Sequence, residues 1–204
     1  SHADTKENSM GLLDGKVAIV TGAGGGLGRT HALALAKEGA KIVVNDLGGA
    51  KDGTGAGTAM ADTVVNEIKE MGGEAVANYA SVADAEVAQS IIQSGVDAFG
   101  RIDIVVNNAG ILRDRTLLKM EDGEYDLVMA VHSRGTYLCT KAAGAYFKDA
   151  GHGGRIINTT SYSGLVGNFG QSNYAMAKAG IAGFTRTIAQ EFARMGVTVN
   201  AVAP

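Results

Sequence analysis

The sequence predicts an α/β fold in which a parallel β-sheet is covered by helices on both faces. Two observations lead to this fold class: short β-branched runs alternate with longer helical patterns, and glycines follow three of the predicted helices. Strands that alternate with helices form βαβ units, whose crossovers place helices on both faces of the sheet. The chain has 204 residues, 46% hydrophobic and 19% charged, which suits one compact core.

The predicted elements alternate along the whole chain. The strands are β-branched runs at 17–21, 41–45, 75–79, 102–107, 155–160 and 197–202. The helices lie between them at 27–38, 58–71, 83–99, 124–148 and 172–195. In the third helix, apolar residues recur at the spacing of one helical face, namely Val87, Ile91, Ile92, Val96 and Phe99. The glycines that end the first three helices are Gly39, Gly72 and Gly100.

Charge and composition exclude several classes of protein. The net charge of −3 gives no sign of a nucleic-acid or anionic-membrane surface. Apolar stretches are short and interrupted, so no transmembrane helix and no membrane partner are expected. Cys139 is the only cysteine and cannot form an intrachain disulfide, which favours a reducing compartment such as the cytoplasm.

The two ends of the chain are unusual. Residues 1–8 are polar and lack the apolar segment of a secretory signal, so we expect residues 1–10 to be a disordered leader or a cloning remnant. Residues 11–204 are expected to form a single domain. The one proline, Pro204, is the last residue. We therefore expect the chain shown to stop before the natural domain does.

A glycine-rich run at 21–28 follows the first predicted strand and opens the first helix. Glycine lets the backbone approach a pyrophosphate, and the helix N-terminus offers free amide groups. Gly22, Gly26 and Gly28 have the spacing Gly-x3-Gly-x-Gly, which differs from the commonest dinucleotide fingerprint and is weak evidence when taken alone. The strand before it and the helix after it strengthen the prediction of a nucleotide site.

Asp46 ends the second predicted strand, 18 residues beyond Gly28. A carboxylate at this place can accept both hydrogen bonds of an adenosine ribose diol, and it repels a 2′-phosphate. No Arg or Lys occurs at 23–27 or 43–50, so the sequence favours NAD over NADP. The alternative is a solvated loop acid. The following residues 48–57 contain five glycines, which predicts a flexible loop without chemistry of its own.

Small polar residues also follow the fourth predicted strand, at 107–110. Ala109 and Gly110 would let a cofactor lie against the backbone, and the Asn108 side chain would reach a ribose. The alternative is a plain Asn/Gly turn.

Tyr174, Lys178 and Ser161 form a candidate proton-transfer group. Helix positions four residues apart share a face, so the Lys178 ammonium would lie beside the Tyr174 phenol. Free tyrosine has a pKa of about 10, and a nearby cation lowers the pKa of a phenol. Ser161, at the end of an apolar strand, would hold a substrate oxygen. Taken alone, the pair fits a surface position equally well, and the glycine run favours the catalytic interpretation.

Together these motifs resemble those of the short-chain dehydrogenase/reductase family. The matching pieces occur in family order from about residue 13 to residue 204: residues 21–28, Asp46, residues 107–110, Ser161, Tyr174 and Lys178. Residues 44–49, 77–79, 107–115 and 167–171 are similar to the (3R)-hydroxyacyl-CoA dehydrogenase domain of peroxisomal multifunctional enzymes. The resemblance implies a three-layer, Rossmann-type doubly wound sheet with strand order 3-2-1-4-5-6, without the family's seventh strand in this chain.

The resemblance also implies a mechanism. Tyr174 exchanges a proton with the substrate, Lys178 promotes that exchange and binds the nicotinamide ribose, and Ser161 fixes the substrate oxygen. Hydride passes between the substrate carbon and the nicotinamide. Further coenzyme contacts fall on Leu27, Ser81, Val82 and Asn108. The family implies a homo-oligomer, a tetramer, and the last helix adds apolar residues that could equally be buried within the subunit, namely Ile181, Phe184, Ile188 and Phe192.

Three departures from the family pattern matter. His132 stands where the family usually has the Asn of a proton relay, although the hydroxyacyl-CoA subgroup tends to have His there too. Its role is therefore open between a relay and helix packing. Ala80 stands where the family often has an Asp near the adenine, which leaves Ser81 and the local backbone to contact that ring. The family also continues past the position of Pro204 with a cofactor loop and a substrate lid.

The sequence therefore predicts an NAD-dependent oxidoreductase for a secondary alcohol or ketone, with a 3-hydroxyacyl thioester such as an acyl-CoA as the specific candidate. The alternatives are a reductase of acyl-carrier-protein thioesters, steroids or xenobiotic ketones, and a regulatory module that senses NAD without turnover. No metal site is expected.

Overall fold

The computed structural model describes residues 11–204, so the leader expected at 1–10 lies outside the described residues. The strands are β1 (Val17–Thr21), β2 (Lys41–Asn45), β3 (Ala75–Asn78), β4 (Ile104–Asn107), β5 (Gly154–Thr159) and β6 (Val197–Val202). The helices are α1 (Gly26–Lys37), α2 (Ala59–Glu70), α3 (Ala85–Phe99), α4 (Asp122–Met129), α5 (Gly135–Ala150), α6 (Tyr162–Val166) and α7 (Ser172–Phe192).

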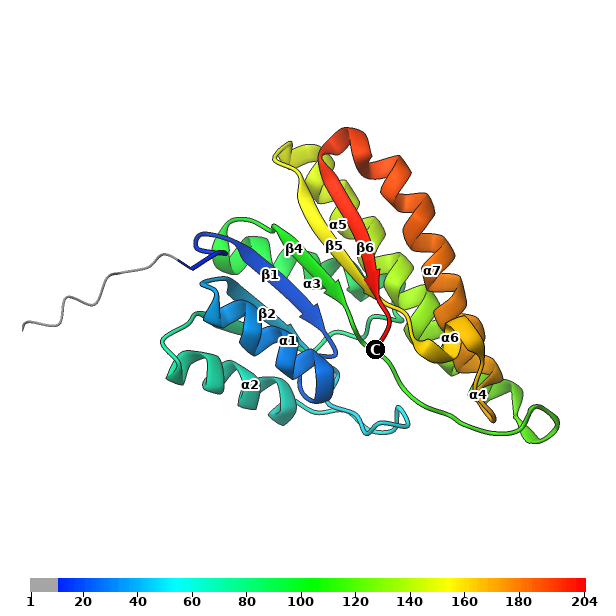
Figure 1. Ribbon diagram of the computed structural model, residues 1–204. Helices are drawn as coiled ribbons and strands as arrows, with labels where there is room; N and C mark the ends of the chain where they lie inside the picture. The colour runs from blue at the N-terminus through cyan, green and yellow to red at the C-terminus, as the bar shows by residue number, and fades with distance from the viewer. Residues whose placement is uncertain (1–10) are drawn as a thin grey trace, which may run out of the picture.

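All six strands form one parallel sheet in the order β3-β2-β1-β4-β5-β6, which confirms the predicted order 3-2-1-4-5-6. Because the strands are parallel, their carboxyl ends share one edge of the sheet, at the lower right of the sheet in Figure 1. The strand order reverses between β1 and β4. In open α/β sheets, ligands bind outside the carboxyl edge at such a point. The fold therefore places the candidate site beyond Thr21 and Asn107, the last residues of these two strands.

Two apolar layers hold the helices against the sheet. Helices α1 and α2 cover one face, and α3 and α5 cover the other (Figure 1). Strand β1 contributes alternate side chains to both layers, Ala18 and Val20 to the first and Val17 and Ile19 to the second. All five residues of β1 are buried, as expected for a central parallel strand.

The prediction of one continuous helix at 124–148 is wrong in one respect, because a π-helical turn interrupts the helix in the structure. Helix α4 passes into a π-helical turn (Ala130–Arg134), and α5 begins after that turn. Gly135, the first residue of α5, lies so close to Val82 that a Cβ atom would be 2.7 Å from a Val82 methyl carbon. π-Helical turns inside α-helices are often found at functional sites, and this one contains His132.

The prediction that Ser161 ends the fifth strand is also wrong. Strand β5 ends at Thr159, and Ser161 caps α6, a short helix that the sequence analysis did not predict. A five-residue helix carries too little apolar periodicity to be recognised from sequence.

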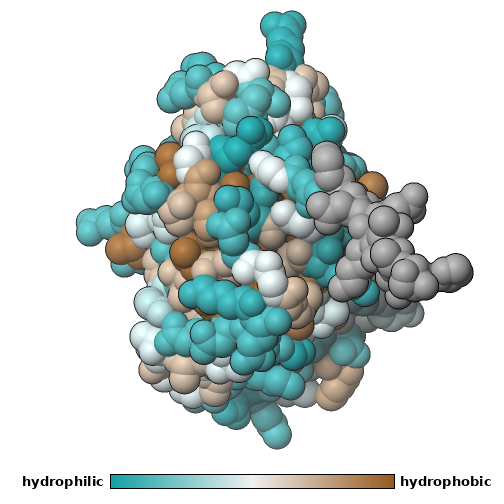
Figure 2. Space-filling view, turned by 90° about the vertical axis from the view of Figure 1, so that its left-hand side faces the viewer, coloured by the Kyte–Doolittle hydropathy of each residue, from teal (hydrophilic) through white to brown (hydrophobic). Residues whose placement is uncertain are grey.

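Among residues 11–204, no helix is both long enough and apolar enough to span a membrane. Figure 2 views the molecule from the left-hand side of Figure 1 and shows hydrophilic residues interspersed with hydrophobic ones over that face. Scattered apolar residues of this kind are normal on a protein surface.

Candidate active site

The turn between β1 and α1 is mostly glycine, because other parts of the protein lie very close to Gly22 and Gly24. Gly22 and Gly26 have φ angles of +61° and +50°, which residues with side chains rarely adopt. A Cβ atom on Gly22 would lie 2.7 Å from the Cα of Ala109, and one on Gly24 would lie 2.8 Å from Cγ of Asp46. Apart from the buried Ala23, the turn is therefore bare backbone, and it leads into the free amide groups at the start of α1.

Thr21 and Asn108 join this turn to the end of β4. The Thr21 hydroxyl accepts hydrogen bonds from the amides of Asn108 at 3.0 Å and Ala109 at 3.1 Å. The Asn108 amide group donates to the carbonyls of Thr21 and Gly22, both at 3.1 Å. A Cβ atom on Gly28 would lie 2.0 Å from the Gly22 carbonyl oxygen. The Asn108 side chain thus supports the turn in this structure, and Thr21 is a site residue that the sequence analysis did not single out.

Asp46 follows β2, and two backbone amides hold its carboxylate. One oxygen accepts from the Gly24 amide and the other from the Gly48 amide, each at 2.7 Å. These bonds fix the carboxylate between the glycine turn and the loop after β2. Because a carboxylate has about four lone-pair sites, two remain for the hydroxyls of a ribose.

A cavity of about 370 Å³ lies along this part of the carboxyl edge, within the usual size range of ligand sites. Eight of the predicted coenzyme residues line it: Gly22, Gly26, Asp46, Ser81, Val82, Asn108, Ala109 and Gly110. Leu27 is instead half exposed, and Gly28 packs beneath the turn. Free amides for a pyrophosphate and a carboxylate for a ribose are both present, so these residues fit a dinucleotide.

The loop at 48–57, for which the sequence predicted no chemistry of its own, forms part of the cavity wall. Ala50, Lys51 and Gly53 line the cavity. Lys51 adds a cation one residue beyond the window in which the sequence analysis found none. Five glycines indicate a loop, but they carry no information about what the loop will contact.

Helix α7 places Tyr174 and Lys178 together, as their spacing predicts. The Lys178 ammonium nitrogen lies 5.6 Å from the centre of the Tyr174 ring and donates to the Thr159 carbonyl at 2.7 Å. Burial lowers the pKa of Lys178 to about 8, and the residue is only 3% exposed. A buried cation beside a phenol is the arrangement expected where a phenol acts as an acid or a base.

His132 packs against the same phenol. It is 2% exposed, and its ring meets the Tyr174 ring edge-on with the ring centres 5.2 Å apart. Its Nε2 atom lies 2.8 Å from the carbonyl oxygen and 3.0 Å from the amide nitrogen of Ile111. A Cβ atom on Gly110 would lie 2.4 Å from the His132 ring. These neighbours favour the packing interpretation, in which His132 connects the turn after β4 to the Tyr174 ring.

The protonation of His132 follows from its surroundings. Burial is the main cause that lowers the pKa of His132 to about 4; the nearby Lys178 cation acts in the same direction, and a hydrogen bond to the Ile111 carbonyl opposes both. The imidazole is therefore neutral at pH 7. A proton relay through His132 stays a prediction that this arrangement does not test.

Ser161 reaches α7 through helix α6. Ser161 is 8% exposed, and its hydroxyl accepts from the Ser163 amide at 3.3 Å. Helix α6 packs closely on α7, because a Cβ atom on Gly164 would lie 2.7 Å from Cβ of Lys178. The three residues of the predicted proton-transfer group thus lie on two adjoining helices.

Asn173 is a further site residue that the sequence analysis missed. It is fully buried, and its side chain accepts from the Tyr174 amide at 2.7 Å and donates to the Arg113 carbonyl at 2.9 Å. These bonds tie the first turn of α7 to the segment that follows the cavity wall at Gly110 and Ile111. An asparagine at the start of a helix gives no sequence signal for such a long-range contact.

The fold and the site together define an α/β protein whose glycine turn and cavity fit a dinucleotide and whose helix α7 places the buried Lys178 beside Tyr174. A family model described as short chain dehydrogenase matches residues 16–204. The chain belongs to the short-chain dehydrogenase family, which confirms the resemblance seen in the motifs.

Individual relatives agree with this assignment. A short-chain type dehydrogenase/reductase of Mycobacterium tuberculosis is 54% identical over 93% of this chain and 66% of its own length. The peroxisomal multifunctional enzyme type 2 of Drosophila melanogaster is 53% identical over 94% of this chain and 31% of its own length. The crystal structure of a short chain dehydrogenase from Mycobacterium avium superposes with a TM-score of 0.88 at 51% identity, covering 95% of this chain and 68% of that chain. The chain therefore spans less than two thirds of the length of the two curated relatives.

Proposed function

We propose that the protein is an NAD-dependent oxidoreductase that interconverts a secondary alcohol and its ketone. The observation that carries the proposal is the buried Lys178 ammonium 5.6 Å from the centre of the Tyr174 ring. Asn173 ties this pair to the segment that borders the nucleotide cavity. Membership of the short-chain dehydrogenase family supports the reaction class.

The chain's own residues divide the work of such a reaction. Tyr174 gives a proton to, or takes one from, the substrate oxygen, and Lys178 places a positive charge beside the phenol. The Ser161 hydroxyl holds the substrate oxygen, and neutral His132 keeps the Tyr174 ring in its orientation. The glycine turn and Asp46 bind and orient the coenzyme. When bound, the coenzyme supplies hydride-transfer chemistry at its nicotinamide.

The proposed coenzyme is NAD. Asp46 supports this choice because a carboxylate at the end of β2 accepts from the ribose diol and repels a 2′-phosphate. Lys51 opposes it in part, because it brings a cation into the same cavity. We expect fluorescence titrations to show tighter binding of NADH than of NADPH. Asp46→Ala should weaken NADH binding by about 1.5–3 kcal/mol and narrow the preference, whereas tighter NADPH binding by the wild type would overturn the assignment.

The proposed substrate class is a 3-hydroxyacyl thioester. Support comes from the 53% identity to a peroxisomal multifunctional enzyme. Turnover should be measured by NADH formation over a panel of 3-hydroxyacyl-CoA, 3-hydroxyacyl-carrier-protein, steroid and simple secondary alcohols. Preference for a thioester supports the proposal, and preference for a steroid or simple alcohol contradicts it. Binding of NADH without turnover of any alcohol would instead indicate a module that senses the coenzyme.

Residues 11–204 are proposed to act as one catalytic domain, and the proposed location is the cytoplasm. The peroxisomal relative makes that organelle the alternative location.

The proposed assembly is a homotetramer, and this proposal rests on the family resemblance. Ile181 is buried within the subunit, and Ile188 and Phe192 pack against its core, so the apolar stripe of α7 adds no support. Light scattering at micromolar concentration tests the assembly.

A further inference from the structure

The glycine loop, defined as residues 47–57, has a compact structure of its own. Its two ends meet, because the Gly57 amide donates to the Leu47 carbonyl at 2.9 Å. Its tip is a turn in which the Ala50 amide donates to Thr54 at 2.8 Å and the Gly53 amide donates to Ala50 at 2.9 Å. Closed ends and internal bonds are the properties of a compact surface loop.

The tip of the glycine loop lies against the segment that follows β4. The Leu112 amide donates to the Lys51 carbonyl at 2.9 Å, and the Arg113 guanidinium donates to the Asp52 carbonyl. A Cβ atom on Gly53 would lie 3.1 Å from the Ile111 side chain. The loop and this segment line the same cavity. The loop therefore joins the β2 side of the cavity to the β4 side, beyond the carboxyl ends of the strands (Figure 1).

The contacts at the tip are few. One backbone hydrogen bond and one guanidinium–carbonyl bond carry the polar part, and Lys51 and Asp52 are exposed. A segment held by few contacts opens far more readily than the core of the fold. Each bond contributes modestly to the closed arrangement, so the loss of one should shift the balance measurably.

Arg113 connects this loop to the catalytic helix. Its side chain donates to Asp52, whereas its carbonyl accepts from Asn173. Asn173 in turn accepts from the Tyr174 amide. The backbone of Arg113 is thus anchored from the α7 side, which gives its side chain a fixed base from which to hold the loop.

We propose that the glycine loop is a gate over the coenzyme cavity and that the Arg113 side chain is the positioning group that latches this gate shut. The inference rests on the proposed function, because it takes the cavity to be the coenzyme site. A gate that is closed both before and after the coenzyme binds slows the association and the dissociation of the coenzyme to the same extent. A residue that only contacted the coenzyme would slow exit alone.

The test compares NADH binding and release by stopped-flow fluorescence for the wild type, Arg113→Ala and Arg113→Lys. Loss of one hydrogen bond should raise the association and dissociation rate constants together, by about five-fold, with little change in Kd. Arg113→Lys keeps a cationic donor but lacks the planar guanidinium, and should therefore restore part of the difference. Arg115→Ala is the matched control, because Arg115 lies two residues away and pairs with Glu124 instead of the loop.

If Arg113→Ala loses NADH binding because it folds poorly, a measurement that needs no coenzyme still tests the proposal. Hydrogen exchange of the Leu112 amide should be faster in Arg113→Ala than in the wild type, while the amides of β4 exchange as before. A rise in dissociation rate and Kd alone would make Arg113 a coenzyme contact and overturn the gate. Unchanged rates, or an equal effect of Arg115→Ala, would also overturn it. Absence of NADH binding by the wild type would overturn the proposed function itself.

Discussion

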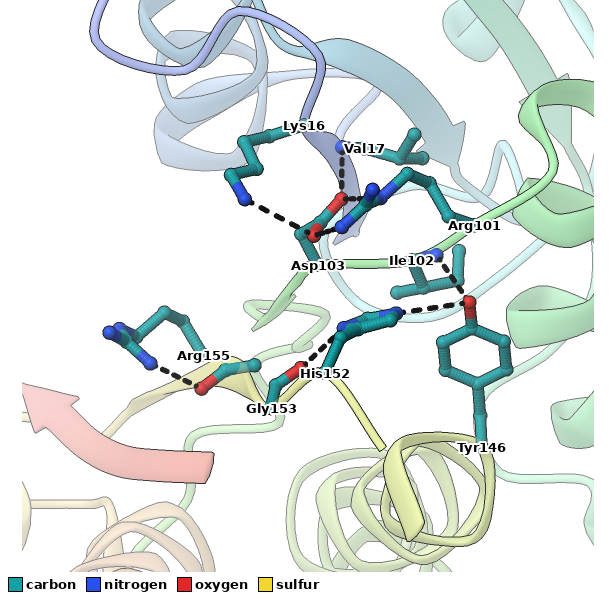
Figure 3. Close-up of polar contacts among 10 residues, drawn as sticks. Lys16, Val17, Arg101, Ile102, Asp103, Tyr146, His152, Gly153 and Arg155 are labelled. Atoms are coloured by element: carbon teal, nitrogen blue, oxygen red, sulfur yellow. Dashed lines mark hydrogen bonds and ion pairs between the residues drawn. The ribbon is translucent and has the colours of Figure 1, made fainter. Parts of the chain in front are cut away.

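The two ends of strand β4 bury polar groups in opposite ways. Asp103, just before the strand, is 6% exposed and fully partnered: it accepts from the Val17 amide at 2.9 Å and from Arg101 at 2.8 and 2.6 Å (Figure 3). Beyond the other end, buried side-chain atoms within residues 11–204 have no hydrogen-bond partner, among them Asn107 Oδ1, His132 Nδ1 and Thr159 Oγ1.

At the amino ends of the strands, which we call the amino edge of the sheet, polar contacts join several elements. Lys16 lies 3.7 Å from Asp103, and the Ile102 amide donates to the Tyr146 hydroxyl of α5 at 3.2 Å (Figure 3). Burial raises the pKa of Asp103, but the hydrogen bonds from Arg101 and Val17 outweigh burial and hold the pKa below its usual range. Every buried charge there has a partner, which is the arrangement of a group that serves stability.

The two ends of the strands therefore differ in whether their buried polar groups stabilise the fold or remain without partners. Unpartnered buried polar groups cost free energy, and they are retained where a water, a ligand or a reaction needs them. The carboxyl edge combines such groups with the buried Lys178 and its lowered pKa. The amino edge should therefore respond to mutation in stability, and the carboxyl edge in activity.

The largest expected effect is at the carboxyl edge. Tyr174→Phe keeps the ring that packs on His132 but removes the transferable proton, so turnover should fall by roughly 10²–10⁴-fold. NADH affinity should change little, because the glycine turn and Asp46 are untouched. Steady-state kinetics and coenzyme titration on the same preparation check both statements. Near-normal turnover with NADH still bound would show that the proton moves by another route.

The second effect concerns acid stability. Because the pKa of folded His132 is about 4 and that of an unfolded histidine is about 6.5, the unfolded state alone binds this proton between those values. Stability should therefore fall as the pH drops from 6.5 to 4, by up to roughly 3 kcal/mol from this group.

His132→Asn tests this expectation. The amide offers a donor and an acceptor to Ile111 but cannot titrate, so the slope of unfolding free energy between pH 6.5 and 4 should flatten. Urea unfolding at several pH values measures the slope, with a change of the exposed His152 to Asn as the matched control. An unchanged slope would mean that His132 does not stay neutral when folded.

The smallest expected effect is at the amino edge. Asp103→Asn removes a charge that accepts from Arg101 and Val17, and should lower the unfolding free energy at pH 7 by about 1–3 kcal/mol. Because the folded-state pKa of Asp103 is depressed, its contribution is present above about pH 4 and lost as the pH falls below that value. The difference in unfolding free energy between the wild type and Asp103→Asn should therefore become smaller below about pH 4.

Activity provides the contrast in the same experiment. Turnover per folded molecule should be unchanged in Asp103→Asn, because Asp103 and Tyr174 lie beyond opposite edges of the sheet. A turnover loss as large as that of Tyr174→Phe would break the comparison between the two edges.

The sequence by itself determined the strands and most of the helices, the strand order through the family motifs, and the Tyr174–Lys178 pair. It could do so because these depend on local spacing: apolar periodicity defines the strands and helices, glycines mark the turn, and four residues make one helical turn. Five predicted strands match the structure to within one residue at both ends, and β2, for example, spans the predicted residues.

Only the tertiary structure decided which distant groups meet. It placed His132 against Tyr174 by inserting a π-helical turn, brought Ser161 to α7 on a helix that was not predicted, and laid the glycine loop across the cavity onto Leu112 and Arg113. These contacts join segments far apart in the chain, and their energies come from packing and hydrogen bonds that no local pattern encodes. Spacing along a sequence carries information about one helix or one turn, whereas a site assembled from several elements depends on how those elements pack.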